Sequence, residues 1–511
     1  MTYVLTYSPN ESLFMTMEIE EAIVNKFNSF EDLFNYYYSK NSKMNIYVKD
    51  LYIFAQESIK QYFRNYNYND SHNIHLLKDD EYTYSFGNST SVCYFISTKH
   101  NKKEIQFIGI DNIIPKQDLQ SLHRTFGGNN GLEAMAEAAK FLESLNNKGR
   151  TIGKIALNEL KNSFSKTAWD IYFPHQENEV DKFIRESFVP GWLYYNDNRS
   201  HEYTRSGKTY DVNSLFPYVM RNFDLPYGNP TYFTKTIPTT GYYFVRLKAA
   251  FTLKERAFPF IRDNCTKQFL SSSERREIIL SKDTYEMFLK YYNIRDLEII
   301  DGYSYKATHG LFNKYIDKWF TIKCNSTGAK RLFSKLMLNN IYGKFGAKPE
   351  TFMSEIELTD ENSIMNVGTY KPSETLYIPI ASSVASIANR ITIEAAIANY
   401  DNFIFAHTDS IHLLGDSVNG IEIDDVELGK WKIEREWSDA YFTPDYNYIE
   451  HETNGSYYIA YFGLRDTPRK QLEDLLSNNT INYYDIYKGI ILKDYRYLRS
   501  SGRFETTTIR V

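Results

Sequence analysis

Residues 210–217 read YDVNSLFP, residues 335–343 read KLMLNNIYG, and residues 407–410 read HTDS. The first stretch predicts a strand that ends at a carboxylate, and the second predicts a helix with a basic face. The third predicts the tip of a β-hairpin that bears another carboxylate. Two carboxylates from distant segments can hold two divalent cations about 4 Å apart, the arrangement that drives in-line phosphoryl transfer. Together the stretches indicate a template-directed nucleotidyl transferase.

The first stretch places Asp211 at the rim of a sheet, before a helix that begins at Leu215 with Ser214 in its N-cap region. The carbonyl of Val212 can face a hard cation, and the N–H groups of Ser214 and Leu215 can face a phosphate. The ring of Phe216 is expected against the sugar, where it would exclude a 2′-hydroxyl. The alternative for this stretch alone is an ordinary capped helix with a surface carboxylate.

The second stretch is the strongest by geometry. At about 100° per residue, Arg331, Lys335, Asn339 and Tyr342 fall within one stripe roughly 80° wide. Lys323, about two turns before Arg331, falls off the edge of that stripe, and Gly343 is expected to end the helix. Two cations, an amide and a tyrosine suit a triphosphate with a base above it. A basic solvated helix face is the alternative.

The third stretch lies between two apolar runs, residues 403–406 and 411–414. Apolar runs on both sides of a short polar tip predict a β-hairpin. Asp409 at the tip is the expected partner of Asp211 across a metal pair. A single aspartate in a turn is otherwise usually structural.

Composition sets limits on these interpretations. The chain has 511 residues, 42 % of them hydrophobic, and a formal charge of −5. This composition predicts a globular protein of several domains. Positive charge is concentrated in residues 311–350 and 488–511, which favours a nucleic-acid partner. The three cysteines are isolated, which argues against a disulfide framework and a zinc site. With no apolar run long enough for a membrane span and no leader pattern, we expect a cytoplasmic protein without a membrane partner.

The order of the predicted elements indicates an α+β protein. Residues 105–110 predict a strand, residues 132–140 a helix, and the glycine-rich residues 126–131 a loop. A Pro-Gly turn at residues 188–191 suggests a domain boundary. Residues 251–300 and 347–377 separate the motif-bearing segments and are interpreted as insertions.

The three stretches, in this order, resemble motifs A, B and C of the family B DNA polymerases, and most closely those of the protein-primed subgroup of small linear-genome phages and linear plasmids. Residues 308–319 resemble the entry to the fingers of that subgroup, and residues 428–431 its palm after motif C. The resemblance implies a right hand of palm, fingers and thumb after an exonuclease-like, ribonuclease H-like α/β domain. The implied division is 1–185 for the exonuclease-like domain and 186–511 for the polymerase domain, the latter comprising palm with insertion 251–300, fingers 311–346, insertion 347–377, palm 378–460 and thumb 461–511.

The resemblance also implies roles and partners. Two Mg²⁺ ions, with Mn²⁺ as an alternative, would bind Asp211, Asp409 and the Val212 carbonyl. The triphosphate would lie on Lys323, Arg331 and Lys335, and on the helix start at Ser214 and Leu215; Asn339 and Tyr342 would line the nascent base pair, and Phe216 would be the sugar gate. DNA contacts are expected at Gly343, Lys344, Ser410 and Tyr448. The implied partners are a DNA template and primer, dNTPs, and a terminal protein that supplies the first hydroxyl.

The chain departs from the family pattern at several positions. His407 stands where motif C normally has an aspartate, and Phe216 stands where the family usually has tyrosine. The Lys-x-Tyr element near the primer end appears as residues 446–448, YNY. The exonuclease motifs lack their carboxylates: residues 6–8 read TYS, an apolar residue takes the expected position near Asp50, and residues 127–131 read GGNNG where an aspartate is expected. We therefore expect an exonuclease-like scaffold without proofreading.

The sequence thus predicts a DNA-directed DNA polymerase that replicates a linear phage or mobile-element genome. An untemplated or defence-associated nucleotidyl transferase on the same palm is a second reading, motivated by His407 and Tyr446. A third is a decayed polymerase that binds DNA or a terminal protein structurally. The intact stripe of Lys335, Asn339 and Tyr342 argues against the third.

Overall fold

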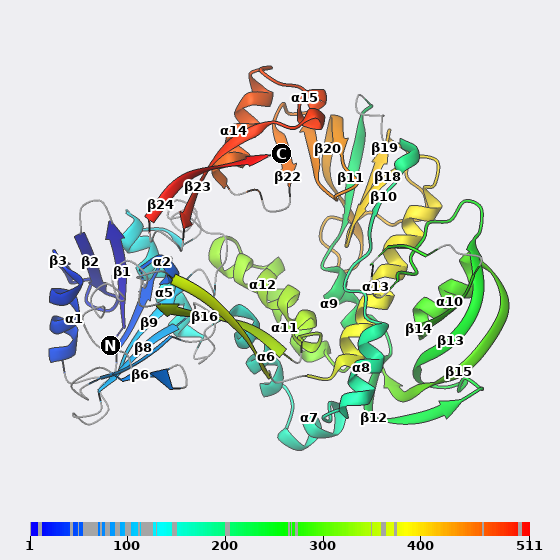
Figure 1. Ribbon diagram of the computed structural model, residues 1–511, viewed down its shortest axis with the longest axis horizontal. Coiled ribbons are helices and arrows are strands. Elements are labelled where there is room, and N and C mark those ends of the chain that lie inside the picture. Colours follow the sequence, from blue (N-terminus) through cyan, green and yellow to red (C-terminus); the bar gives the residue numbers. More distant parts are fainter. Residues whose placement is uncertain are drawn as a thin grey trace.

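The computed structural model describes residues 2–8, 13–40, 44–49, 51–54, 70–71, 74–76, 82–86, 92–97, 104–110, 113, 126–128, 130–145, 151–199, 205–263, 266, 268–270, 274–348, 350–358, 364–372, 376–461, 464, 466–498 and 503–510. In Figure 1 the N-terminal sheet lies at the left, a pair of helices in the centre, and two further sheets at the right.

The N-terminal part is built on a nine-stranded sheet with the strand order β3-β2-β1-β4-β9-β8-β7-β6-β5. Its strands are β1 (Thr2–Ser8), β2 (Leu13–Glu18), β3 (Val24–Phe27), β4 (Met44–Val48), β5 (Asp70–Ser71), β6 (Ile74–Leu76), β7 (Tyr82–Phe86), β8 (Val92–Ser97) and β9 (Glu104–Gly109). The strands β1, β4 and β9 are parallel, whereas β2 runs antiparallel beside β1 and β3 runs antiparallel beside β2. An antiparallel meander followed by parallel strands is the arrangement expected of a ribonuclease H-like sheet. Residues 105–110 therefore form the predicted strand.

Helices of the N-terminal part fall into two groups. The helices α1 (Phe30–Ser39) and α2 (Leu51–Phe54) help to bury a separate apolar cluster. The helix α5 (Gly131–Ser144) confirms the prediction for residues 132–140 and packs on β1 and β2. The helices α6 (Ile152–Asn162), α7 (Lys166–Tyr172) and α8 (Asn178–Glu186) instead pack on elements that follow residue 186. These three helices therefore belong by packing with the elements that follow them, and the domain boundary at residue 185 stays a prediction.

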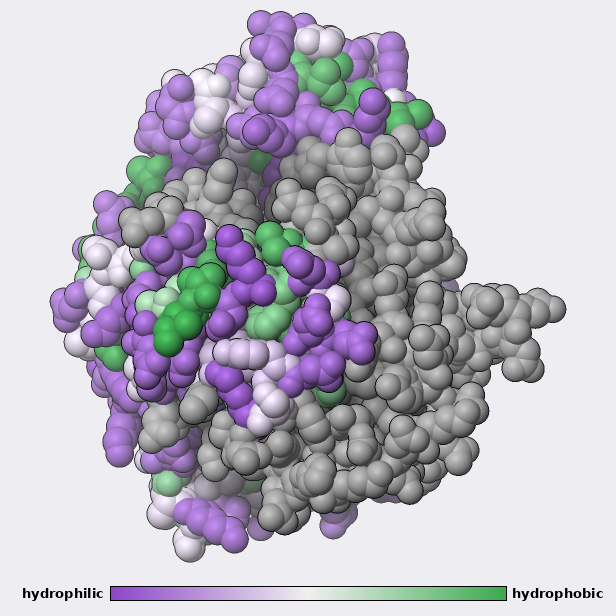
Figure 2. All heavy atoms as spheres, turned by 90° about the vertical axis from the view of Figure 1, so that its left-hand side faces the viewer, coloured by the Kyte–Doolittle hydropathy of each residue, from purple (hydrophilic) through white to green (hydrophobic). Residues whose placement is uncertain are grey.

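The outer surface of the N-terminal part is mostly hydrophilic where it is described. Figure 2 shows small apolar groups among hydrophilic residues on this face. Ile23 and Val24 are about half exposed, the latter on the edge strand β3. Scattered apolar residues of this kind are normal on a soluble surface.

A seven-stranded antiparallel sheet carries the first and third motifs. Its strands are β10 (Leu193–Tyr195), β11 (Gly207–Val212), β18 (Phe403–His407), β19 (Ser410–Leu414), β20 (Trp431–Phe442), β21 (Tyr448–Glu452) and β22 (Tyr457–Ala460), and the short helix η3 (Asp197–Arg199) follows β10. The strand order is β10-β18-β19-β11-β20-β21-β22. The hairpin β18–β19 confirms the prediction for residues 403–414, and its apolar runs are buried almost throughout. Because β11 pairs with β19, with Asp211 opposite Ser410, the first and third motifs meet where these two strands end.

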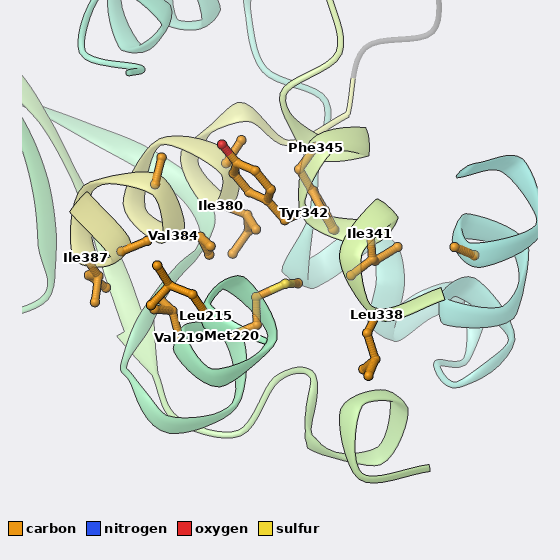
Figure 3. Close-up of a cluster of buried hydrophobic side chains, with 14 of the residues drawn as sticks. Leu215, Val219, Met220, Leu338, Ile341, Tyr342, Phe345, Ile380, Val384 and Ile387 are labelled. Carbon is orange, nitrogen blue, oxygen red and sulfur yellow. The ribbon is translucent and has the colours of Figure 1, made fainter. Parts of the chain in front are cut away.

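Three helices hold this edge in place. They are α9 (Leu215–Asn222), α12 (Gly328–Phe345) and α13 (Ile378–Ala398), and α11 (Asn313–Cys324) pairs with α12. Figure 3 shows their apolar side chains in one cluster, with Leu215 and Val219 from α9, Ile341 from α12 and Val384 from α13. These side chains are at most 1 % exposed. The cluster therefore ties the first motif to the helix of the second, and α11 with α12 coincides with the predicted fingers.

The four-stranded sheet differs from the predicted insertion. It comprises β12 (Leu225–Thr234), β13 (Tyr242–Leu253), β14 (Arg275–Ser281) and β15 (Tyr292–Thr308), with α10 (Lys282–Tyr291) packed on it. The predicted bounds at residues 251 and 300 lie inside β13 and β15. Both bounds therefore fall within strands of one continuous sheet, and the insertion at residues 251–300 stays a prediction. Residues 347–377 contain the hairpin β16 (Glu350–Leu358) and β17 (Ile364–Pro372).

The C-terminal part contains α14 (Asp466–Ser477), α15 (Tyr483–Lys488) and the hairpin β23 (Ile491–Leu498) and β24 (Arg503–Arg510). It lies at the top of Figure 1, above the central helices α11 and α12. Its apolar cluster includes Leu472 and Ile486 and continues onto β21 through Ile449. Within the described parts of the chain, no helix has both the length and the apolar character needed to cross a membrane.

Candidate active site

A cavity of about 800 Å³ lies where the edge of the seven-stranded sheet meets α11 and α12. It is lined by side chains from all three motifs and from the segment after the hairpin. The lining residues are Asp211, Val212, Asn213, Ser214, Leu215, Phe216, Lys323, Gly328, Arg331, Leu332, Lys335, Asn339, Asn340, Tyr342, Gly343, Lys344, Ala347, Asp409, Asp425, Lys432 and Glu434. The structure therefore brings the three stretches together, and this volume can hold a nucleotide-sized ligand.

The first motif bends sharply after β11. Ser214 is the N-cap of α9 and adopts the left-handed region, with φ of 54°, which differs from the ordinary capping geometry that the sequence indicated. Its hydroxyl makes no capping bond and instead accepts a hydrogen bond from Lys323 Nζ at 3.0 Å. A non-glycine residue with positive φ marks local strain that its surroundings must stabilise. Here the strained turn joins a finger lysine to the helix start where a phosphate would bind.

The hairpin tip is held by backbone contacts. Thr408 has φ of 60°, and the N–H of Asp409 donates to the carbonyl of His407 at 2.8 Å. The N–H of Val212 donates to the carbonyl of Asp409 at 2.9 Å, which links the two motifs directly. Gly191 lies against the tip, and a Cβ added there would approach Thr408 Oγ1 to 2.7 Å. The predicted Pro-Gly turn is not formed: residues 188–192 have no regular secondary structure, and the glycine permits the close approach to Thr408.

The pKa values of the Asp211 and Asp409 carboxyl groups are both raised. Burial, and then the charge of Asp211, raise the pKa of Asp409 to about 7. Burial also raises the pKa of Asp211, and the opposing Lys432 ammonium lowers it in part. Lys432 Nζ lies 3.0 Å from Asp211 Oδ1, and Glu434 adds a third acidic side chain. A site that holds carboxylates above their ordinary pKa suits a bound cation.

Lys432, Glu434 and Asp425 were missed at the sequence level. Lys432 pairs with Asp211 across β20 and β11, while Arg435 pairs with Thr209, so that Glu434 is the extra residue of a β-bulge. The bulge keeps Glu434 at the cavity beside Lys432. The mixed charges of β20 resemble an ordinary solvated strand, and only the pairing with β11 identifies them.

The finger stripe is assembled differently from the prediction. Arg331, Lys335, Asn339 and Tyr342 lie on α12 as expected, but Lys323 belongs to the preceding helix α11. Arg331 donates a hydrogen bond to the carbonyl of Lys323 at 2.9 Å, which joins the two helices. Burial and the neighbouring Arg331 lower the pKa of Lys323. All five side chains still line the cavity.

The end of the finger helix also differs. Gly343 does not end the helix, which continues to Phe345 with Gly346 at its C-cap. Gly343 and Lys344 line the cavity, as their predicted role requires. A Cβ on Gly343 would contact nothing within 4 Å, so its surface is open.

Two aromatic rings close the cavity on one side. Phe216 and Tyr342 are stacked, with ring centroids 4.0 Å apart and an angle of 7° between their planes. The hydroxyl of Tyr342 donates to the carbonyl of Pro190 at 2.8 Å. Because stacked rings at this distance leave no space between them, a nucleobase could reach the facing sides of these rings only if the rings separate.

Other predicted residues lie away from the cavity. Ser410 is buried and donates to the carbonyl of His407 at 3.3 Å, and His407 itself is exposed outside the lining. Tyr448 is buried beside Phe442, with its ring 4.8 Å from that of His412. In this structure neither Ser410 nor Tyr448 therefore offers its side chain to the cavity.

A buried polar network surrounds Thr209, two residues before Asp211 on the same strand. Glu450 is fully buried and accepts hydrogen bonds from Thr209 and Arg435. His412 Nδ1 lies 2.7 Å from Glu450 Oε1. Burial alone would raise the pKa of Glu450, but the facing His412 and Arg435 outweigh it and lower that pKa. Since Thr209 and Asp211 belong to one strand, this network fixes the strand that carries the first carboxylate.

The donors present fit a hard divalent cation. Asp211, Asp409 and the Val212 carbonyl supply oxygen ligands, which Mg²⁺ prefers. Within the described residues, no group of three or more His, Cys, Asp or Glu side chains is arranged to hold a metal ion by itself. Mg²⁺ typically binds through one or two carboxylates together with substrate phosphates. The site therefore matches cations that a triphosphate helps to hold.

The N-terminal sheet contains the exonuclease-like positions. Thr6 lies in β1 with its hydroxyl buried and without a hydrogen-bond partner. Asp50, Cys265 and most of the segment after Phe54 lie outside the described residues, whereas Cys93 lies in β8. Cys324 is an exposed free thiol. The prediction that proofreading is absent stays a prediction.

Comparisons with known proteins agree with this geometry. The profile of the family described as DNA polymerase type B, organellar and viral, matches residues 3–420. A DNA polymerase of Bacillus phage Nf is 32 % identical over 340 residues, and one of Bacillus phage phi29 is 31 % identical over 338 residues. Each alignment covers 63 % of this chain and 59 % or 58 % of the relative.

The solved structure of phi29 DNA polymerase complexed with primer-template DNA and incoming nucleotide substrates has the same fold. It superimposes with a TM-score of 0.86 at 22 % identity, covering 100 % of this chain and 99 % of that one. The predicted α+β right-hand fold, preceded by an exonuclease-like domain, is thereby confirmed.

Proposed function

This chain belongs to the organellar and viral type B DNA polymerases, and from that premise we propose that it is a template-directed DNA polymerase that extends a primer by nucleotidyl transfer. The observation that carries the proposal is the shared cavity, in which Asp211 and Asp409 face Lys323, Arg331 and Lys335. Because the alignments span about three fifths of the curated phage relatives, the activity of those proteins enters here as a proposal.

The basic side chains of α11 and α12 indicate that the substrate is a nucleoside triphosphate. Lys323, Arg331 and Lys335 come from two helices and converge on the cavity opposite the carboxylates. A triphosphate bound there would have its α-phosphate directed toward Asp211 and Asp409. Asn339 and the stacked pair of Phe216 and Tyr342 would meet the base and sugar. A base could insert between the two rings only if they separate.

Two Mg²⁺ ions, when bound to Asp211, Asp409 and the Val212 carbonyl, would activate the primer 3′-hydroxyl and neutralise the charge on the leaving pyrophosphate. The residues of this chain do the remaining work. The hydrogen bond from Val212 N–H to the carbonyl of Asp409 holds the two carboxylates in register. Lys335 and Arg331 would hold the β- and γ-phosphates in line with the hydroxyl.

Three finer statements belong to the same proposal. The chain would start replication on a hydroxyl of a terminal protein, as the resemblance to the protein-primed subgroup suggests. It would lack proofreading, because the exonuclease-like segment at residues 6–8 has no carboxylate. It would contact DNA through Gly343 and Lys344, which line the cavity.

Primer extension tests the proposal. A primed DNA template with dNTPs and Mg²⁺ or Mn²⁺ is given to the wild type, Asp211→Ala and Asp409→Ala, with the exposed Asp416→Ala as a matched control. We expect template-complementary products with the wild type and the control, and none with the other two variants. Products that ignore the template would favour the untemplated transferase instead. No incorporation by the wild type with either metal, even from a terminal-protein primer, would refute the polymerase.

A second assay tests proofreading. Labelled single-stranded DNA is incubated with the wild type and with Asp211→Ala, and released dNMP is measured. We expect no release from either protein. Release that survives Asp211→Ala would show a separate exonuclease site and refute that part of the proposal.

A further inference from the structure

The lysine opposite the first carboxylate has no place in the mechanism above. Lys432 lies on β20 directly across from Asp211 on β11. Its Nζ is 3.0 Å from Asp211 Oδ1 and 3.9 Å from Glu434 Oε1. It also lines the cavity. A fixed positive charge therefore lies against the same carboxylate oxygen that a divalent cation would need.

This pair differs from a surface ion pair in its surroundings. The Lys432 and Asp211 side chains are 29 % and 18 % exposed, and they open onto a cavity rather than onto the outer surface. Strand pairing holds the two backbones opposite each other, so the contact needs little ordering of the long side chain. Asp409 and Glu434 add negative charge nearby. Such a contact is stronger than the exposed pairs that contribute almost nothing.

We infer that Lys432 is a tethered cation that competes with divalent metal for Asp211, so that the empty site binds metal weakly until a triphosphate enters. The inference rests on the proposed function, since it concerns the same carboxylates. Mg²⁺ approaches its oxygen ligands to about 2.0–2.1 Å. An ammonium in contact with that oxygen obstructs the approach and repels the ion.

The surrounding groups allow the lysine to give way. Glu434 pairs with Arg435 through Oε2 at 3.0 Å, and its Oε1, 3.9 Å from Lys432 Nζ, offers that lysine a second partner on the same strand. The phosphates of a nucleotide held by Lys335 and Arg331 would add negative charge to the cavity. Metal and nucleotide would then favour each other's binding, because each relieves the charge that the other leaves unbalanced. Without metal, the ion pair with Lys432 holds the Asp211 side chain in place.

Direct metal binding tests the inference without polymerase turnover. The free Mn²⁺ signal in electron paramagnetic resonance is titrated with the full chain, without DNA or nucleotide. The proteins are the wild type, Lys432→Met, Lys432→Gln and Lys432→Arg. Lys430→Met is the matched control, because Lys430 is similarly exposed on the same segment but pairs with Glu422. The unfolding midpoint of each variant is measured in EDTA, and Lys432→Gln replaces Lys432→Met if the latter does not fold.

Removal of the charge should tighten Mn²⁺ binding by about tenfold, which corresponds to about 1.4 kcal/mol. Lys432→Arg and Lys430→Met should stay within about twofold of the wild type. Equal or weaker binding by Lys432→Met and Lys432→Gln would overturn the inference, and so would tightening of the same size in Lys432→Arg or Lys430→Met. Absence of measurable Mn²⁺ binding by both neutral variants would overturn it too. Failure of primer extension would refute the proposed function, whereas the Mn²⁺ titration would still test the inference about Lys432.

Discussion

Replacement of Asp409 by asparagine should stabilise the metal-free protein while it abolishes catalysis. Asparagine has the shape of aspartate without its charge, and Asp409 is the carboxyl whose pKa is raised to about 7 by burial and by Asp211. In the unfolded chain the same group titrates near 3.8. The folded state therefore holds an extra proton between these two values. The free energy of unfolding of the wild type must fall as the pH rises from about 4 to about 7, and it stays lowered above that range.

The magnitude follows from the size of the shift. Each pKa unit corresponds to about 1.4 kcal/mol, so a shift from 3.8 to about 7 has an upper limit of roughly 4 kcal/mol. Because Asp409 opens onto the cavity and shares its repulsion with Asp211, we expect about half of this, roughly 2 kcal/mol at pH 8. For a domain of ordinary size that corresponds to a gain of roughly 4–8 °C in the unfolding midpoint.

Scanning calorimetry in EDTA at pH 8 and pH 5 measures this difference. Asp409→Asn should unfold at a higher temperature than the wild type at pH 8, and the gain should shrink at pH 5. Asp416→Asn is the control, because Asp416 is 92 % exposed and its removal should change little. Asp211→Asn should gain less than Asp409→Asn, because it leaves Lys432 without its partner. A destabilised Asp409→Asn variant, or a gain that does not depend on pH, would refute the electrostatic argument.

Three further variants test the geometry of the site. Glu434→Gln should lower Mg²⁺-dependent dNTP incorporation by about 10–100-fold, as loss of a supporting ligand group usually does. Steady-state kinetics measures the rate of incorporation, and an unchanged rate would show that Glu434 does not support the metal site. Gly191→Ala should push Thr408 and displace Asp409, lowering kcat by about 10–100-fold without change in the Kd for primed DNA; an equal loss of DNA binding would point to general misfolding. Phe216→Val should reduce discrimination against ribonucleotides by at least about tenfold, measured as the ratio of kcat/KM values, and an unchanged ratio would show that this ring is no sugar gate.

The elements of the site were predictable where one short segment contains the whole signal. The hairpin around Asp409 shows two apolar runs around a polar tip, and β18 and β19 form as expected. The stripe of Arg331, Lys335, Asn339 and Tyr342 depends only on helical periodicity, and α12 presents it to the cavity. Lys323 falls off the edge of that stripe because it belongs to α11, and periodicity alone does not show the break between α11 and α12. Its place in the cavity depends on the packing of the two helices.

What the sequence left hidden depends on strand pairing. Lys432 meets Asp211 only because β20 pairs with β11, and Arg435 reaches Glu450 only because the bulge at Glu434 shifts the register. Without that extra residue, alternation would place Glu434 opposite Thr209 and direct it into the buried network. One inserted residue thus separates two tasks on one strand: Lys432 and Glu434 face the cavity, while Arg435 neutralises the buried carboxylate beneath it. No periodicity within residues 431–437 shows this division, because it depends on the pairing of β20 with β11, which lies more than 200 residues earlier in the chain. Only the folded sheet therefore shows which of these charged side chains lie beside Asp211 and Asp409.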